Sequence, residues 1–529
     1  MSASIPRHPA ERGASPPRAA TSDHLAMWAQ FRPDAEALVD IGTGQRWSWR
    51  QLHADSLAWA ATLARRSVGP GDRVAVLAAN RGDTIALLYA AAHLGAILFP
   101  MNIRLSPAEL AWQVGHSEPR VLVADAGHLD VAHGLVPDPL SMDAGPRRDL
   151  PTPPRARTGN RLGDPWQLMY TSGSSGRPKG ALLSHRQVHW NALNTILACD
   201  LSPASSTLTF APLFHTGGMN CLTTPLLHRG GRVVVMPRLD AGEALRCIAE
   251  EGITHLMGVP TIYQMLADHP DFARTDLRCV QDAICGGAPL GAALLERYLA
   301  RGIPLRQGFG LTEVGPNCFS TPPHRVRDKL GTVGMPIHHV EARLIRPDGT
   351  PCEVDEPGEL LLRGPVVCSG YWRDPEATAA AIDDGWFHTG DVLSMDADGF
   401  FTVRGRLKEM YISGGENVYP AEVEAALQTH PDIATAAVIG VPDDRWGEVG
   451  MAFIEVVPGR SLDVAALTTW LRGRLARFKI PKHFALTDTL PRTGSGKVDK
   501  PALAARAPAG RRPALAPVNA ASPTPPEPT

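Results

Sequence analysis

The 529-residue sequence has little that marks a secreted or nucleic-acid-binding protein. Its 8 cysteines form neither C-x-x-C pairs nor a Cys/His metal spacing, and a chain of this length does not need disulfide bonds to fold. With 52 basic and 54 acidic residues, the net charge of -2 gives no whole-chain attraction for nucleic acid or for an anionic membrane surface. We therefore expect reduced thiols, a cytosolic location and no nucleic-acid partner.

A long hydrophobic run is also missing. The longest apolar stretch, residues 84–99, is interrupted by a histidine and a glycine and is shorter than the roughly 20 residues that a membrane-spanning helix needs. It predicts a buried helix over residues 85–93 and a strand over residues 96–99. We therefore expect no integral membrane association.

The two ends of the chain are poor in the residues that build a core. Residues 1–22 are rich in Ala, Ser, Pro and Arg and lack the apolar segment of a secretory signal, which favours a disordered arm over a transit peptide. Residues 505–529 are rich in Pro and Ala, and we expect them to be disordered as well.

Between these ends, apolar segments alternate between helical and strand spacing. Helical patterns cover residues 56–63, 241–251 and 261–267, and short apolar strands cover residues 73–77 and 253–257. Such alternation is typical of an α/β protein with layered, mostly parallel sheets.

The pattern changes after Asp391. Strands are expected over residues 399–403, 436–441 and 452–457, and helices over residues 421–427 and 464–476. This order predicts a small α+β domain. We expect a large N-terminal domain over residues 23–407 and a C-terminal domain over residues 408–504.

The most informative segment is residues 170–180, Tyr-Thr-Ser-Gly-Ser-Ser-Gly-Arg-Pro-Lys-Gly, which contains four Ser/Thr hydroxyls, three glycines and one lysine. Glycines let backbone N–H groups approach an anion, and hydroxyl and ammonium groups bind phosphate. The strand expected over residues 166–170 would hold this loop at the end of a sheet. The common nucleoside-triphosphatase loop is excluded because Pro178 stands where its second glycine should be, and Gly180 follows Lys179 instead of a hydroxyl residue.

Three further segments follow in order: Phe-Gly-Leu-Thr-Glu at 309–313, Trp-Phe-His-Thr-Gly-Asp at 386–391, and Pro-Arg-Thr-Gly-Ser-Gly-Lys at 491–497. Together with the loop, they resemble the signature series of the AMP-forming adenylating superfamily, which comprises acyl-CoA synthetases, carrier-protein adenylation domains and beetle luciferases. The resemblance covers residues 23–503. It departs from the family at Ser174-Ser175, where two threonines are frequent.

The resemblance implies a site for ATP and Mg²⁺. Glu313 would bind Mg²⁺, Thr312 would contact the α-phosphate, and Lys497 would stabilise the charge of the first reaction step. The remaining nucleotide contacts would come from the phosphate loop, an adenine segment, the residues before Thr312 and two ribose-binding side chains: Thr171, Ser172, Gly173, Ser174, Ser175, Gly176, Lys179, Gly287, Ala288, Pro289, Phe309, Gly310, Asp391 and Arg406.

A second step would transfer the acyl group from the adenylate to a thiol. The resemblance implies that the C-terminal domain rotates about Lys408 and brings a glycine-containing segment to the thiol. Coenzyme A would then contact Gly414, Gly415, Glu416, Phe478 and Lys482, with Arg81 as a further candidate.

The acid pocket should include His215, Gly217, Gly218 and Met219, and Gly217, Gly218 and Gly310 should leave room for an acyl chain or a flat ring. No basic residue stands out there to pair a second carboxylate, so a monocarboxylic acid is favoured.

Residues 414–424 resemble bacterial fatty acyl-CoA synthetases, which favours a fatty acid and free CoA. An aryl-CoA ligase, an enzyme loading a separate carrier protein and a non-catalytic nucleotide-binding protein are the alternatives. The oligomeric state stays open, a homodimer being one option.

Overall fold

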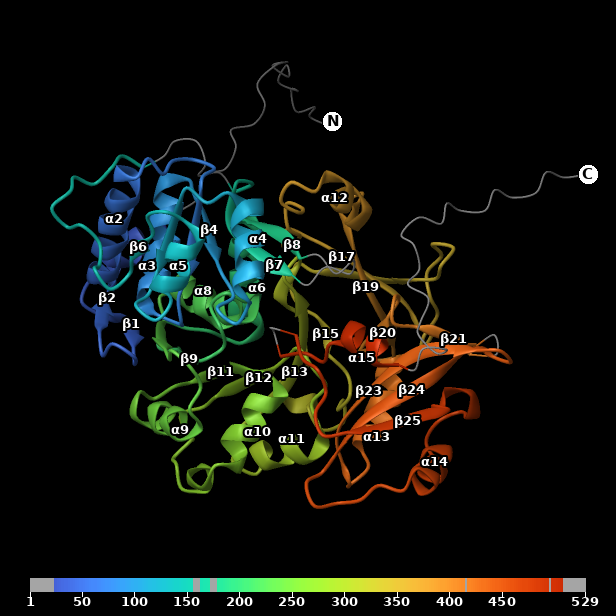
Figure 1. The fold of residues 1–529 in the computed structure, drawn as a ribbon. Helices are drawn as coiled ribbons and strands as arrows, with labels where there is room; N and C mark the ends of the chain where they lie inside the picture. Colours follow the sequence, from blue (N-terminus) through green and yellow to red (C-terminus); the bar gives the residue numbers. More distant parts are fainter. Residues whose placement is uncertain (1–22, 156–161, 172–177, 414–415, 494–495, 508–529) are drawn as a thin grey trace, which may run out of the picture. The chain divides into compact units, whose positions relative to one another are not determined.

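The computed structural model describes residues 23–155, 162–171, 178–413, 416–493 and 496–507. The chain divides into two compact units (Figure 1). Unit 1 consists of residues 1–342, 361–388 and 399–401, and unit 2 of residues 343–360, 389–398 and 402–529.

The largest sheet of unit 1 has nine strands, in the order β15 (Met335–Pro336), β14 (Gly315–Ser320), β13 (Leu305–Leu311), β12 (Asp282–Cys285), β11 (His255–Gly258), β9 (Ser206–Thr209), β10 (Arg232–Val235), β1 (Glu36–Asp40) and β2 (Arg46–Ser48). The strands from β13 to β1 pair in parallel, and β14, β15 and β2 add antiparallel edges.

The second sheet of unit 1 has six strands, in the order β6 (Leu140–Ser141), β5 (Val121–Ala124), β3 (Arg73–Leu77), β4 (Ile97–Pro100), β7 (Pro165–Thr171) and β8 (Lys179–Ser184). All neighbours pair in parallel except β7 and β8, which are antiparallel.

Helices separate most of the parallel strands, as expected of crossover connections. Unit 1 contains α1 (His24–Phe31), α2 (Trp49–Arg65), α3 (Gly82–Leu94), α4 (Pro107–Ser117), α5 (Leu129–Leu135), α6 (His185–Ala198), α7 (Thr216–Gly218), α8 (Thr224–Arg229), α9 (Ala241–Glu250), α10 (Pro260–Asp268), α11 (Ala292–Leu299) and α12 (Pro375–Ala381). A π-helical turn, Met219–Thr223, joins α7 to α8.

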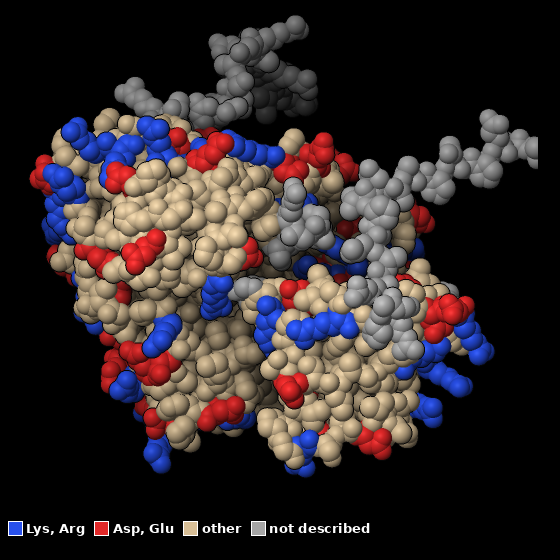
Figure 2. All heavy atoms as spheres, viewed as in Figure 1, with Lys and Arg blue, Asp and Glu red and all other residues tan. Residues whose placement is uncertain are grey.

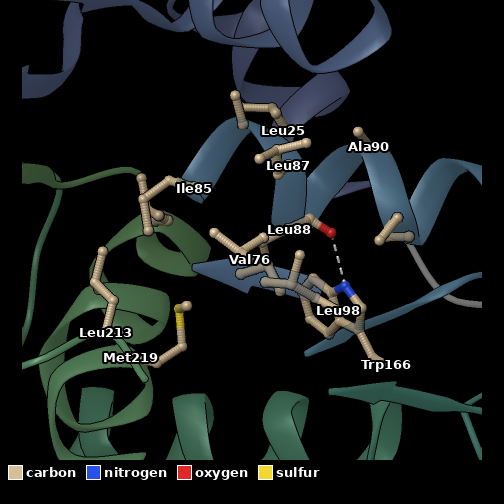
Figure 3. Close-up of a cluster of buried hydrophobic side chains, with 14 of the residues drawn as sticks. Leu25, Val76, Ile85, Leu87, Leu88, Ala90, Leu98, Trp166, Leu213 and Met219 are labelled. Carbon is tan, nitrogen blue, oxygen red and sulfur yellow. Dashed lines mark hydrogen bonds between the residues drawn. The ribbon is translucent and has the colours of Figure 1, made fainter. Parts of the chain in front are cut away.

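The main core of unit 1 gathers around α3 and β3 (Figure 3). Ile85 and Leu88 of α3 pack with Val76 of β3 and are inaccessible or nearly so. Trp166 of β7 joins this cluster and donates a 2.9 Å hydrogen bond from its indole nitrogen to the carbonyl of Leu88. The apolar run that lacks the length of a membrane span is therefore a core helix, and no helix among the described residues meets the length and hydropathy of a membrane-spanning segment.

Unit 2 is built on a sheet of β22 (Glu416–Val418), β21 (Tyr411–Ser413), β24 (Gly447–Val456) and β23 (Ile433–Asp443), with β25 (His483–Thr487) parallel to β24. Its helices are α13 (Pro420–Gln428), α14 (Val464–Arg472) and α15 (Lys500–Arg506).

A further sheet contains the points where the chain passes from one unit to the other. Its strands are β16 (Glu341–Ile345), β17 (Gly358–Arg363), β19 (Trp386–Met395) and β18 (Ile382–Asp383), with β20 (Phe401–Arg406) paired to β19.

The predicted α/β class, with a large mostly parallel part and a smaller α+β part, is confirmed. Some element bounds were wrong. The helix predicted over residues 56–63 begins at Trp49, because Ser48 and Gln51 form a reciprocal cap on the first turn of α2.

Other predicted bounds differ as well. The strand expected over residues 399–403 is β20, which begins at Phe401, and the helix expected to reach residue 476 ends at Arg472. Helix α15 ends at Arg506, inside the segment expected to be disordered. On the face shown in Figure 2, basic and acidic side chains are interspersed, in keeping with the net charge of -2.

Candidate active site

The phosphate-binding loop predicted from the sequence connects two antiparallel strands. Thr171 at the end of β7 pairs with Lys179 at the start of β8. Ser172, Gly173, Ser174, Ser175 and Gly176 lie outside the described residues. The loop therefore belongs to a hairpin of the six-stranded sheet, and both of its described ends carry groups that can contact an anion.

Glu313 lies in the turn between β13 and β14 and faces the end of that hairpin. Its Oε1 accepts hydrogen bonds from the hydroxyl of Thr171 at 3.3 Å and from the hydroxyl of Tyr371 at 3.1 Å. The Glu313 carbonyl accepts a 2.7 Å hydrogen bond from the backbone of Cys368. Two segments far apart in the sequence, at residue 171 and at residues 368–371, thus hold Glu313 in place.

Tyr371 is a candidate site residue that the sequence did not indicate. Burial, followed by the neighbouring Glu313 carboxylate, raises the pKa of its hydroxyl, so Tyr371 stays neutral and donates to Glu313. The ammonium of Lys179 lies 5.0 Å from the centre of the Tyr371 ring. No motif marks Tyr371, because its position depends on chain pairing near residue 371 that the sequence pattern does not reveal.

Gln187 of α6 holds the neighbouring Thr312. Its side-chain amide donates a 3.0 Å hydrogen bond to the carbonyl of Thr312. Gln187 is placed by the start of α6, where the hydroxyl of Ser184 caps the helix by accepting from the Gln187 backbone.

The candidate adenine segment follows the carboxyl end of β12. Gly287 has φ +78°, which few other residues adopt, and the carbonyl of Ala288 accepts a 3.1 Å hydrogen bond from Gln307 of β13. Ala288 and Pro289 are exposed. Phe309 of β13 packs edge-on against Phe319 of β14, with 5.7 Å between ring centres.

The predicted acid-pocket residues surround α7. His215 precedes the helix and contacts the ring of Phe214 at 4.7 Å between centres, while Met219 is fully buried in the main core. A Cβ on Gly217 would meet only the flexible end of Met257, at 2.6 Å.

Two of the predicted spacer glycines do not leave room for an acyl chain in the direction a side chain would take. A Cβ on Gly218 would lie 2.2 Å from the carbonyl of Pro212, and one on Gly310 would lie 2.3 Å from the backbone of Pro316. The expectation was wrong for these two residues, because the chain's own backbone fills the space.

In unit 2, Asp391 and Arg406 form an ion pair of 2.8 Å between Oδ1 and Nε. Asp391 is 3 % exposed, and within the part of the chain that the structure describes its Oδ2 has no hydrogen-bond partner. Burial raises the pKa of Asp391, opposed by Arg406 and Lys497. A buried carboxylate oxygen without a donor fits the predicted ribose contact, because a diol can supply the missing hydrogen bond.

Lys497 lies near this pair within unit 2. The Lys497 residue is exposed as a whole, yet close packing around its ammonium, and then Arg406, lower its pKa, while Asp391 raises it. The backbone of Thr493 donates a 2.7 Å hydrogen bond to the Lys497 carbonyl, so the loop carrying Lys497 is closed by a turn. Lys408 is exposed in the turn between β20 and β21.

The predicted CoA contacts are spread over unit 2, except for Arg81 in unit 1. Gly414 and Gly415 lie outside the described residues, and Glu416 and Phe478 are exposed. Lys482 forms a 2.9 Å ion pair with Asp443. Arg81 is held by Asp83 at 2.9 Å and Asp143 at 2.5 Å, so its charge is already matched in this structure.

The described residues fit a bound Mg²⁺. Both hydrogen bonds to the Glu313 carboxylate fall on Oε1, and none of the described residues donates to Oε2. A carboxylate oxygen beside a Thr hydroxyl is the hard oxygen donor set that Mg²⁺ takes from proteins, usually completed by phosphates and water.

Comparison with protein families identifies the class. Residues 25–372 match the family model described as AMP-binding enzyme, and residues 422–497 match the one described as AMP-binding enzyme C-terminal domain. The chain belongs to this family and is an AMP-forming acid–thiol ligase.

Relatives of the chain include CoA ligases named for aromatic acids and for long-chain fatty acids. The chain is 41 % identical to a feruloyl-CoA synthase of an Amycolatopsis species, over 90 % of this chain and 97 % of that one. It is 38 % identical to the indoleacetate–CoA ligase of Aromatoleum aromaticum, over 86 % and 92 %. It is similar in structure to the Bacillus subtilis O-succinylbenzoate CoA synthetase solved with ATP and magnesium ion, with a TM-score of 0.82 and 30 % identity over 90 % and 98 %.

Proposed function

We propose that this enzyme joins an aromatic monocarboxylic acid to coenzyme A, using ATP and Mg²⁺ and releasing AMP and pyrophosphate. The observation that carries the ligase chemistry is the convergence of Thr171, Lys179 and Glu313 at the end of the β7–β8 hairpin that bears the predicted phosphate loop. The relatives at 41 % and 38 % identity, a feruloyl-CoA synthase and an indoleacetate–CoA ligase, support an aryl acid.

In the first half-reaction, the acid's carboxylate attacks the α-phosphorus of ATP, the bond from that phosphorus to the bridging oxygen breaks, and pyrophosphate leaves. Lys179 and the hydroxyls of Thr171, Ser172, Ser174 and Ser175 hold the β- and γ-phosphates. The Glu313 carboxylate would hold Mg²⁺, which would neutralise phosphate charge. Tyr371 and Thr171 keep that carboxylate oriented through Oε1.

Other residues position the nucleotide and the acid. Asp391 and Arg406 bind the ribose, and Lys497 stabilises the charge that develops between carboxylate and α-phosphate. The acid lies along His215 and Gly217. The aromatic ring or chain of the acid is its apolar part and would pack against apolar residues of the pocket.

In the second half-reaction, the thiol of CoA attacks the adenylate carbonyl and AMP leaves. We propose that Lys408 is the hinge between a domain over residues 23–407 and one over residues 408–504. Gly414, Gly415, Glu416, Phe478 and Lys482 contact CoA.

A fatty acid is the second candidate, supported by the resemblance of residues 414–424 to bacterial fatty acyl-CoA synthetases. A thiol on a separate carrier protein is the alternative acceptor of the acyl group.

The deciding experiment measures Mg²⁺- and ATP-dependent pyrophosphate release with ferulate, indoleacetate, O-succinylbenzoate and fatty acids of graded length, with and without CoA, and follows acyl-CoA by mass. Preferred turnover of an aryl monocarboxylate with a matching aryl-CoA supports the proposal. Preference for fatty acids replaces the substrate class, and release without any CoA product points to a carrier protein.

A further inference from the structure

A second polar site lies in unit 1, and none of its lining residues belongs to the candidate active site. A cavity of about 170 Å³ borders the main core, and five histidines line it: His24, His93, His185, His189 and His228. Five imidazoles around one small cavity are far more than packing of apolar side chains requires, since histidine is intermediate in its preference for burial.

Three of these histidines come from three separate helices. His24 is the first residue of α1, His189 lies in α6, and His228 lies in the last turn of α8. The indole of Trp28 donates a 3.1 Å hydrogen bond to the His228 carbonyl, and Arg32 donates a 2.7 Å hydrogen bond to the carbonyl of Gly230. His24, Trp28 and Arg32 are spaced by one helical turn, so one face of α1 is fastened to the end of α8.

The three imidazoles lie close together. One ring nitrogen from each of His24, His189 and His228 lies within 4.8 Å of the other two. The ring centres of His24 and His228 are 3.8 Å apart, and those of His189 and His228 are 4.9 Å apart.

The charged side chains of Asp23 and Arg155 at the cavity balance one another. Asp23 and Arg155 both line it, and the Arg155 guanidinium donates to Oδ2 of Asp23. The Asp23 carboxylate also caps α1 by accepting from Ala26 at 2.9 Å. The ion pair therefore brings no net positive charge that would repel a cation.

We propose that His24, His189 and His228 bind one divalent transition-metal ion, with water in the remaining position. Three imidazoles suit zinc, cobalt, nickel and copper, and exclude the oxygen-seeking Mg²⁺ and Ca²⁺. The metal would cross-link α1 to α6 and α8.

The present spacing requires a small closure. Metal–nitrogen bonds of about 2.0–2.1 Å in a tetrahedral site bring the ligand nitrogens to roughly 3.3 Å from one another. The ligand nitrogens now lie within 4.8 Å of one another, and rotation of the imidazoles about their side-chain bonds is the movement that would bring them to this spacing. The alternative is a metal-free cluster in which the three imidazoles only pack against one another.

The test uses the untagged full-length chain, stripped of metal, and Zn²⁺ titrated against a competing chelator. We expect one tight equivalent of Zn²⁺ and a higher thermal unfolding midpoint, because a ligand bound only by the folded state stabilises it. Co²⁺ in place of Zn²⁺ should give the visible absorption of a tetrahedral nitrogen site. Absence of a tight equivalent, or a Co²⁺ spectrum of an octahedral aquo ion, overturns the proposal.

Variants locate the site. His189→Gln and His228→Asn should each weaken Zn²⁺ binding about a hundredfold or more, since loss of a ligand exceeds the 10–100-fold cost of losing an outer partner. His93→Gln is the matched control, because His93 lines the same cavity but its Nε2 lies 2.9 Å from the carbonyl of Pro153. Equal affinity in all four proteins would mean that Zn²⁺ binds elsewhere. The Co²⁺ spectrum of the unaltered chain keeps the proposal testable if a variant fails to fold.

Discussion

The hydroxyl of Thr171 donates a 3.3 Å hydrogen bond to Oε1 of Glu313, across a sequence separation of 142 residues. Thr171 ends a strand of the six-stranded sheet, and Glu313 occupies a turn of the nine-stranded one. Two sheets of unit 1 therefore meet through a side chain expected to hold phosphate and a side chain expected to hold Mg²⁺.

Glu313→Gln tests whether the charge of this carboxylate is used. The amide retains an oxygen for Thr171 and Tyr371 but loses its charge for the cation, so we expect acid-dependent pyrophosphate exchange to fall by about two orders of magnitude or more and the KM for Mg²⁺ to rise. Tyr371→Phe is the control: it removes one hydrogen bond to the same oxygen and leaves the carboxylate. If Glu313→Gln loses no more activity than Tyr371→Phe, the carboxylate only supports the fold.

A second prediction concerns the buried pair of Arg306 and Asp282, which links β13 to β12. Their side chains are 2 % and 9 % exposed, and Nε of Arg306 lies 2.7 Å from Oδ1 of Asp282. Arg306→Met should destabilise the chain by about 3–5 kcal/mol, because it leaves a buried carboxylate without its partner. Adding Asp282→Leu should restore much of that loss. Denaturant unfolding of the three proteins checks this, and a double variant no more stable than Arg306→Met would contradict it.

The sequence predicted those features of the fold and site that depend on local pattern. The strand at residues 73–77 was predicted with its bounds, because its apolar residues are contiguous and fully buried in a parallel sheet. The start of α2 was missed because its first turns have few buried apolar residues: before residue 56 the helix buries Trp49, Leu52 and the polar Asp55.

Long-range pairing accounts for the rest. The motifs indicated Glu313 and Thr171 separately, but nothing in either segment indicates their hydrogen bond. Tyr371 and Gln187 lie outside the four motif segments, and tertiary packing brings them to the site. Of the three histidines proposed to bind a metal, His24 precedes His189 by more than 160 residues and His228 lies on a third helix, so sequence spacing could not have revealed them.

Lys497→Ala should separate the two half-reactions. Loss of a positioned ammonium should slow adenylate formation by about two to three orders of magnitude and leave thioester formation from a supplied acyl-adenylate nearly unchanged. Lys482→Ala is the complementary variant, because we expect it to raise the KM for CoA and spare adenylation. Equal losses in both assays for Lys497→Ala would remove its assignment to the first step.

Lys408→Pro tests the hinge. Proline fixes φ near −65°, so the variant should hold one backbone conformation at this turn and lose thioester formation while adenylate formation persists. Lys408→Ala keeps the backbone freedom and removes the charge, and it should support both steps. A variant Lys408→Pro that loses the two activities in parallel would contradict the hinge.

Asp391→Asn should weaken ATP binding while the stability of the folded chain is maintained or increased. Burial raises the pKa of Asp391 in the folded chain. At low pH the carboxyl is protonated in both the folded and the unfolded state. As the pH rises from the ordinary pKa through the raised one, ionisation of this carboxyl lowers the free energy of unfolding. Above that window the penalty is complete. The amide removes it, so we expect the thermal unfolding midpoint at neutral pH to be maintained or raised, with a smaller fall between acidic and neutral pH than in the unaltered chain.

The same substitution should raise the KM for ATP about tenfold to a hundredfold, because a hydrogen bond to a charged group is worth about 1.5–3 kcal/mol. Asp444→Asn, at an exposed carboxylate of unit 2, is the control and should change neither quantity. A drop in the unfolding midpoint with an unchanged KM for ATP would make Asp391 a partner of Arg406 in the fold alone. The unpaired Oδ2 argues for the opposite result, since a buried oxygen left without a donor among the described residues costs stability unless a ligand supplies one.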